Sequence, residues 1–104
     1  MDDDRKRLTV WQQDKLRVDA ELSDSGDLVI RGQDLSGTLW SEYEYALTVK
    51  ALDVDKVISA LGGAPDADVL ALLAANAESI VKTGEKAWLE RNSVPAEFWS
   101  RIDP

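Results

Sequence analysis

The sequence predicts an α+β fold in which three to four N-terminal strands form an antiparallel sheet and three to four C-terminal helices pack on it. Before about residue 50, apolar and polar residues alternate with the period of two that is typical of strands. After residue 52 the apolar spacing becomes that of amphipathic helices. The sequence contains no strand–helix–strand unit, so a parallel, doubly wound sheet is not expected.

The first two strands are predicted to form a hairpin. Residues 8–11 are rich in strand formers and indicate a short first strand or a packed arm ahead of it. Residues 15–22 alternate without a fault, with apolar residues at even positions and charged residues at odd ones. Residues 23–27 predict a turn in which Gly26 can adopt a positive φ. Residues 28–31 then follow as the second strand of the hairpin.

The longest predicted strand runs from about residue 39 to residue 50, after a glycine-bounded loop at 32–37. Its alternation defines an apolar face that we expect to point into the core. That face consists of Tyr43, Tyr45, Leu47 and Val49. The opposite face carries Glu42 and Glu44, and Trp40 falls on it by parity.

Helical patterns fill most of the rest of the chain. Asp53 is a good N-cap for a helix at 54–61, which a pair of glycines ends. A second helix is predicted at 66–82, opened by Pro65 and almost wholly apolar in its middle. An apolar helix of this kind is usually the buried centre of a domain.

Two further helical segments are predicted near the C-terminus. Residues 85–91 form a short third helix. Residues 93–97 have a serine, an early proline and a glutamate, which are typical of a helix start. Three apolar residues, Phe98, Trp99 and Ile102, are expected to anchor the C-terminal turn.

The length of 104 residues fits one domain. We expect a charged, flexible tail at 1–7 and the domain at 8–104. The N-terminus lacks the apolar stretch of a signal peptide, and no apolar run approaches the ~20 residues that cross a bilayer. The expectation is therefore a cytoplasmic protein without membrane contact.

The chain has no cysteine and no histidine. It therefore cannot form a disulfide, a thiolate zinc site or the familiar pairs of a nucleophile and a histidine base. No calcium or phosphate motif is complete, so we expect no metal and no cofactor, and we assign no catalytic residue. Hydrolysis by two carboxylates, Glu42 and Glu44, is a less favoured alternative.

The net charge of −8 is concentrated in residues 19–55, where nine acidic residues face two basic ones, a balance of −7. Such a field repels nucleic acid and attracts basic surfaces. The sequence predicts an acidic sheet face with one large aromatic residue, suited to a basic protein partner. The predicted partner-binding residues are Trp40, Glu42, Glu44, Asp34, Asp19 and Glu21. The alternative is that Trp40 lies beneath a loop or the N-terminal arm while the acids remain hydrated.

Residues 27–50 and the closing pattern Trp88-Leu89 followed by Pro95-Ala96-Glu97-Phe98-Trp99 give a resemblance to immunity proteins of bacterial toxin systems. The likeness is one of size, charge and style, and it transfers no residue role. It implies a stoichiometric inhibitor that covers the basic active site of a nuclease or a similar toxin.

The leading hypothesis is a non-catalytic protein–protein interaction module, such as an immunity or inhibitor protein. The alternative is a homodimeric structural or regulatory module. In that case the sheet, or an apolar helix edge around Trp88 and Trp99, pairs with its copy. The sequence leaves open whether the protein is a monomer or a homodimer.

Overall fold

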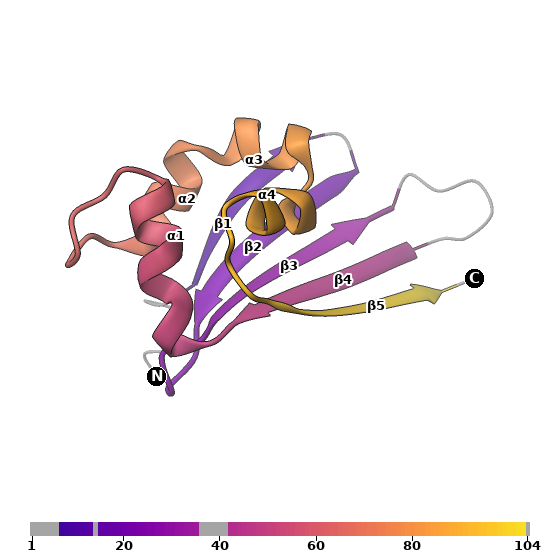
Figure 1. Ribbon diagram of the computed structural model, residues 1–104. Coiled ribbons are helices and arrows are strands. Elements are labelled where there is room, and N and C mark those ends of the chain that lie inside the picture. The colour runs from indigo at the N-terminus through magenta and orange to yellow at the C-terminus, as the bar shows by residue number, and fades with distance from the viewer. Residues whose placement is uncertain (1–6, 14, 36–41, 104) are drawn as a thin grey trace.

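Five strands form one antiparallel sheet in the order β1-β2-β3-β4-β5 in the computed structural model, which describes residues 7–13, 15–35 and 42–103 (Figure 1). The strands are β1 (Arg7–Gln13), β2 (Leu16–Leu22), β3 (Leu28–Asp34), β4 (Glu42–Val49) and β5 (Glu97–Asp103). Between β4 and β5 lie the 3₁₀ helix η2 (Ala51–Asp53) and the helices α1 (Val54–Ala60), α2 (Val69–Ala75), α3 (Ala77–Thr83) and α4 (Glu85–Arg91). The predicted α+β class and the antiparallel sheet are confirmed.

The predicted order of strands first and helices afterwards is wrong at the C-terminus. Residues 93–97 do not start a helix, and the segment that follows is β5, paired with β4. After α4, Ser93 adopts a left-handed φ of 59° and turns the chain back toward the sheet. The residues beyond it are aromatic, β-branched or alternating polar, which suits a strand once the edge of β4 offers a partner.

The first half of the sheet follows the prediction more closely. β1 and the hairpin of β2 and β3 form where they were expected, and Gly26 in the turn has a φ of 91°. Arg7 belongs to β1, so the predicted tail does not extend to residue 7. The predicted loop at 32–37 is wrong for residues 32–34, which continue β3. Residues 36–41, which include the start of the predicted third strand, lie outside the described part of the chain.

The helices at 54–61 and 85–91 are confirmed as α1 and α4. The predicted helix at 66–82 is wrong in its bounds, because it is divided into α2 and α3 at Asn76. The Asn76 Nδ2 atom donates a hydrogen bond of 2.8 Å to the Leu72 carbonyl oxygen, which competes with continuation of the helix. Asp68 caps α2, accepting hydrogen bonds from two backbone amides. Asp53 occupies the N-cap position of α1, but its carboxylate binds Lys56 Nζ at 2.6 Å instead of a helix amide.

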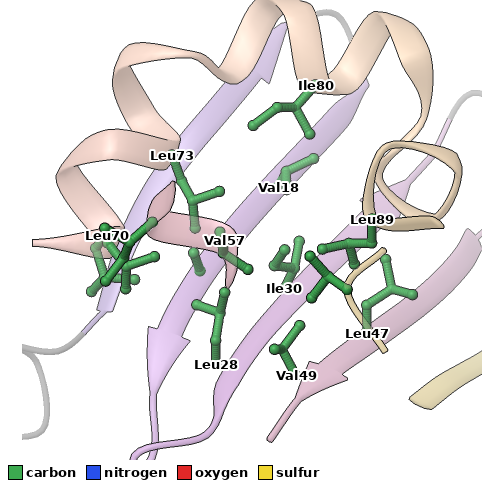
Figure 2. Packing of buried hydrophobic residues seen from close by; sticks show 14 residues of the cluster. Val18, Leu28, Ile30, Leu47, Val49, Val57, Leu70, Leu73, Ile80 and Leu89 are labelled. Carbon is green, nitrogen blue, oxygen red and sulfur yellow. The ribbon is translucent and has the colours of Figure 1, made fainter. Parts of the chain in front are cut away.

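The helices cover one face of the sheet, and the core lies between the two layers (Figure 2). This face carries the apolar positions predicted from the alternation, including the buried residues Val18, Ile30 and Leu47. Leu89 of α4 is 1% exposed and packs over β3 and β4 beside Ile30 and Leu47 (Figure 2). Burial of these side chains fixes the register, since a slip of one residue would turn the apolar set toward water.

The opposite face of the sheet is not covered by any of the described helices (Figure 1). We call it the open face. None of the described helices is long and apolar enough to cross a membrane.

Candidate binding face of the sheet

Strand pairing arranges the residues of the open face in rows that run across the strands. One row contains Asp19 of β2, Arg31 of β3, Ala46 of β4 and Trp99 of β5. The neighbouring row consists of Arg17, Gln33, Glu44 and Arg101 on the same four strands. Four strands therefore contribute side chains to one surface.

A hollow of about 290 Å³ lies between these two rows. Its floor includes the backbone of Gly32 and Tyr45, which stand between the two rows on β3 and β4. Trp99 lies at the β5 end of the hollow and is 50% exposed. The small side chain of Ala46 separates Trp99 from Arg31 in the same row. The full lining is Arg7, Arg17, Asp19, Arg31, Gly32, Gln33, Glu44, Tyr45 and Trp99.

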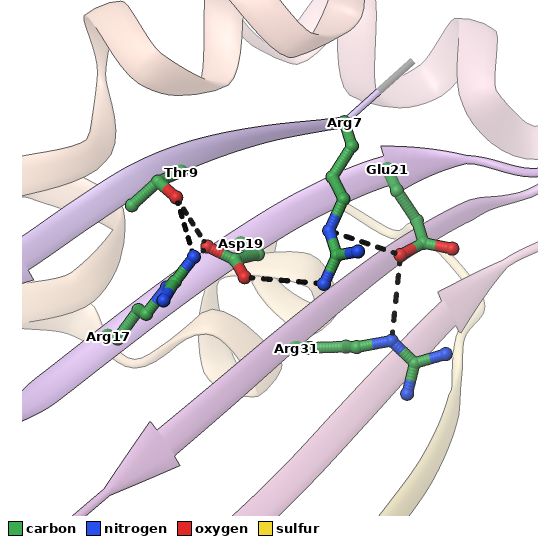
Figure 3. A network of polar contacts seen from close by, with 6 residues as sticks. All are labelled: Arg7, Thr9, Arg17, Asp19, Glu21 and Arg31. Atoms are coloured by element: carbon green, nitrogen blue, oxygen red, sulfur yellow. Dashed lines mark hydrogen bonds and ion pairs between the residues drawn. The ribbon is translucent and has the colours of Figure 1, made fainter. Parts of the chain in front are cut away.

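At the other end of the hollow, three arginines share two carboxylates (Figure 3). Asp19 accepts a hydrogen bond from Arg17 Nε at 3.1 Å and from the Thr9 hydroxyl at 2.8 Å. The Arg7 guanidinium spans both acids, at 3.8 Å from Asp19 and 4.0 Å from Glu21. Arg31 Nε lies 3.7 Å from Glu21. This corner has an excess of guanidinium groups, and the arginines are about half exposed.

The β4–β5 half of the open face has the opposite balance. Arg101 binds Glu44 at 3.2 Å, and Lys50 lies 3.9 Å from Glu97. Gln33 Nε2 donates a hydrogen bond of 2.7 Å to Glu42 Oε2. In this half three glutamates accompany Arg101 and Lys50, an excess of one negative charge. The β1–β3 side has an excess of one positive charge, so the open face is weakly polarised between its two sides.

Four of the predicted acidic residues lie on this face, and arginines lie among them. Among the strand side chains described on this face, four arginines interleave with five carboxylates. The arginines are Arg7, Arg17, Arg31 and Arg101, and the carboxylates are Asp19, Glu21, Glu42, Glu44 and Glu97. The charge count over residues 19–55 did not predict this, because three of the arginines lie outside that segment. Antiparallel pairing places them opposite its acids.

The structure brings some of the predicted binding residues together but not others. Asp19 and Glu21 on β2 share the open face with Glu42 and Glu44 on β4, and β3 lies between the two pairs. Asp34 pairs with Tyr43 and therefore takes the parity of the helix-covered face, so its predicted place beside the glutamates is wrong. Trp40 lies outside the described residues.

Trp99 is the aromatic residue that sequence reasoning did not assign to this surface. The segment was interpreted as the end of a helix, so its parity was not considered. The alternation in this segment indicates the placement of Trp99. If the segment is a strand, Phe98, Ser100 and Ile102 fall on one face, and Trp99 and Arg101 fall on the other.

A partly buried polar pair beneath the floor of the hollow joins the sheet to α4. The Tyr45 hydroxyl donates a hydrogen bond of 2.6 Å to Glu85 Oε2, and Glu85 is 7% exposed. Burial, followed by this bond to a carboxylate, raises the pKa of Tyr45 well above its usual value. Tyr45 therefore stays a neutral donor, and its ring lies against Gly32 on the helix-covered side.

The electrostatics of Glu42 bear on the carboxylate-hydrolase alternative. The hydrogen bond from Gln33 is the main cause that holds the pKa of Glu42 below its usual value. A general acid requires the opposite shift in pKa.

Within the described residues, no group of three or more acidic side chains is placed to hold a metal ion.

Replacing Gln33 with leucine is expected to raise the pKa of Glu42 toward its usual value, because the principal donor to the carboxylate is lost. Carboxyl carbon chemical shifts measured against pH report this change. Glu78 on α3 is a matched control, since its lowered pKa depends on Lys82 and should not respond. An unchanged titration of Glu42 in the variant would show that Gln33 does not hold the carboxylate.

Comparison with known proteins finds no matching family model, no matching curated protein and no matching solved structure.

Proposed function

We propose that this chain is a non-catalytic protein-binding module that presents the open face of its sheet to a partner protein. The observation that carries the proposal is a half-exposed tryptophan on a sheet face that the described helices leave uncovered. Trp99 is surrounded by polar and charged side chains, which is the arrangement of an aromatic anchor inside a hydrated rim.

The charge pattern gives the partner's chemistry. Arginines predominate on the β1–β3 side and glutamates on the β4–β5 side, so a complementary surface carries acidic groups opposite the first and basic groups opposite the second. Complementary charges of this kind orient an encounter and raise its rate more than they raise affinity. This differs from the basic partner that the sequence alone favoured.

An inhibitor or immunity protein would use such a surface, because inhibition by a small domain requires a stable contact and no chemistry of its own. The absence of histidine and cysteine supports binding over the familiar nucleophile–base forms of catalysis. A toxin partner would offer its basic residues to the glutamates of β4 and β5.

The test is capture of partners from the native host by immobilised protein, followed by affinity measurement with the purified partner. We expect Trp99→Ala to weaken binding at least about 30-fold, the effect of losing an aromatic hot spot. Arg31→Glu should weaken binding and also reduce its dependence on salt. Leu52→Ala is the matched control, since Leu52 is 81% exposed but lies in η2 and not on a strand of the open face. A partner that binds the Trp99 variant as tightly as the wild type contacts another surface, and the proposal then fails.

A further inference from the structure

The two edges of the sheet differ in how they are protected. β1 carries a register shift between Thr9 and Trp11 and packs against α2 and α3. β5 pairs with β4 without any shift, and residues 97–102 are all exposed. In the described part of the chain, no strand pairs with the outer side of β5. Proteins usually blunt such an edge with bulges, prolines or short strands, because its free amides and carbonyls accept another strand.

β5 also exposes large apolar side chains on both of its faces. Trp99 lies on the open face, whereas Phe98 and Ile102 lie on the helix-covered side and are 45% and 55% exposed. Lys86 Nζ of α4 lies over the Phe98 ring, 5.9 Å from its centre, yet Phe98 remains 45% exposed. A strand added beside β5 would bury apolar surface on both faces of the sheet at once.

We propose that β5 pairs antiparallel with β5 of a second copy of this chain, with the two-fold axis between the two Trp99 residues. Antiparallel pairing about Trp99 places Glu97 of each copy opposite Arg101 of the other, on the same face. Two opposite-charge pairs then flank a central aromatic pair. A register centred on Arg101 would instead place two arginines opposite each other, and one centred on Ser100 would leave both charged pairs unmade.

This register joins two five-stranded sheets into one continuous sheet. The axis stands perpendicular to the sheet, so both helix layers lie on one side and both open faces form a single surface on the other. A single strand pair buries less area than a standard interface, so we expect a dimer that dissociates in the micromolar range. This inference does not depend on the proposed function, because it concerns the purified chain alone.

Sedimentation equilibrium at about 0.15 M salt tests the dimer, since the Debye length of about 8 Å screens the repulsion between two acidic chains. Glu97→Arg places like charges at both flanking positions, and Arg101→Glu does the same with the opposite sign. We expect each single variant to raise the dissociation constant about tenfold. An equimolar mixture of the two should form a heterodimer at near wild-type strength, because each variant then faces its opposite.

The mixing experiment separates pairing across the edge from damage within one chain. Contacts inside each chain, such as those of Lys50 with Glu97 and of Glu44 with Arg101, are not restored by mixing. Arg31→Glu makes the same charge change as Arg101→Glu, but on β3 and not on the edge strand. It should leave the dimerisation constant unchanged while it weakens partner binding. Circular dichroism confirms that each variant is folded. A chain that stays monomeric at hundreds of micromolar, or a dimer that mixing does not restore, overturns the proposal.

Discussion

Gly32→Val is expected to lower the free energy of unfolding by about 3 kcal/mol or more, because overpacking is combined with the loss of a partly buried hydrogen bond. A Cβ atom on Gly32 would overlap with Cζ, Cε2 and the hydroxyl oxygen of Tyr45. The ring cannot stay in place, so its hydrogen bond to Glu85 is lost as well. Urea denaturation of the variant and the wild type measures the difference.

The control is the double variant with Tyr45→Ala, in which the obstructing ring is absent. Gly32→Val should lower the free energy of unfolding clearly less in that background than in the wild type, because the two residues interact directly. If the two substitutions lower the free energy of unfolding additively, the valine is destabilising for a reason other than overlap with the Tyr45 ring. The outcome also bears on the proposed binding face, since the backbone of both residues contributes to the floor of the hollow.

Gly32 illustrates what the sequence could not show. A glycine between two apolar runs indicates a turn or a loop by local rules, and the prediction for 32–34 followed them. The reason for the glycine is a residue thirteen positions away, because β3 and β4 pair Gly32 with Tyr45. Glycine within a strand marks a close approach, and here the approach is made by an aromatic ring.

The alternation of β2 and β4 predicted their faces correctly because one side of each is buried, and burial imposes a period of two. Glu42 and Glu44 were therefore placed on the correct face. β5 was missed because a short run with two aromatic residues after a proline is compatible with either a strand or a helix. The free edge of β4, which is a tertiary feature, decides between them.

The arginines of the open face were not predicted for a related reason. A sum over consecutive residues treats neighbours in sequence as neighbours in space. In an antiparallel sheet the relevant neighbours lie on adjacent strands, so Arg7 meets Glu21 and Arg101 meets Glu44. Register had to be known before the acids could be matched with their partners.

Tyr45→Phe is expected to cost about 1.5–3 kcal/mol of stability at neutral pH, the usual range for a hydrogen bond to a charged group. The substitution leaves the Glu85 carboxylate, which is 7% exposed, without this donor. Tyr43→Phe removes a hydroxyl from the neighbouring ring, 5.8 Å away, and serves as the matched control. Tyr43→Phe leaves the hydrogen bond from Tyr45 to Glu85 in place, so it should lower the free energy of unfolding less than Tyr45→Phe does.

The cost of Tyr45→Phe should also depend on pH, with a sign set by the raised pKa of Tyr45. In the unfolded chain the phenol ionises near its ordinary pKa of 10.0, whereas in the folded chain it remains protonated. The contribution of Tyr45 is therefore complete below pH 10 and is lost as pH rises above it. Urea denaturation at several pH values should show the wild type approaching the phenylalanine variant under alkaline conditions. Parallel profiles for the two proteins would mean that the phenol is not held neutral by Glu85 and the core, and that α4 is fixed to the sheet by apolar packing alone.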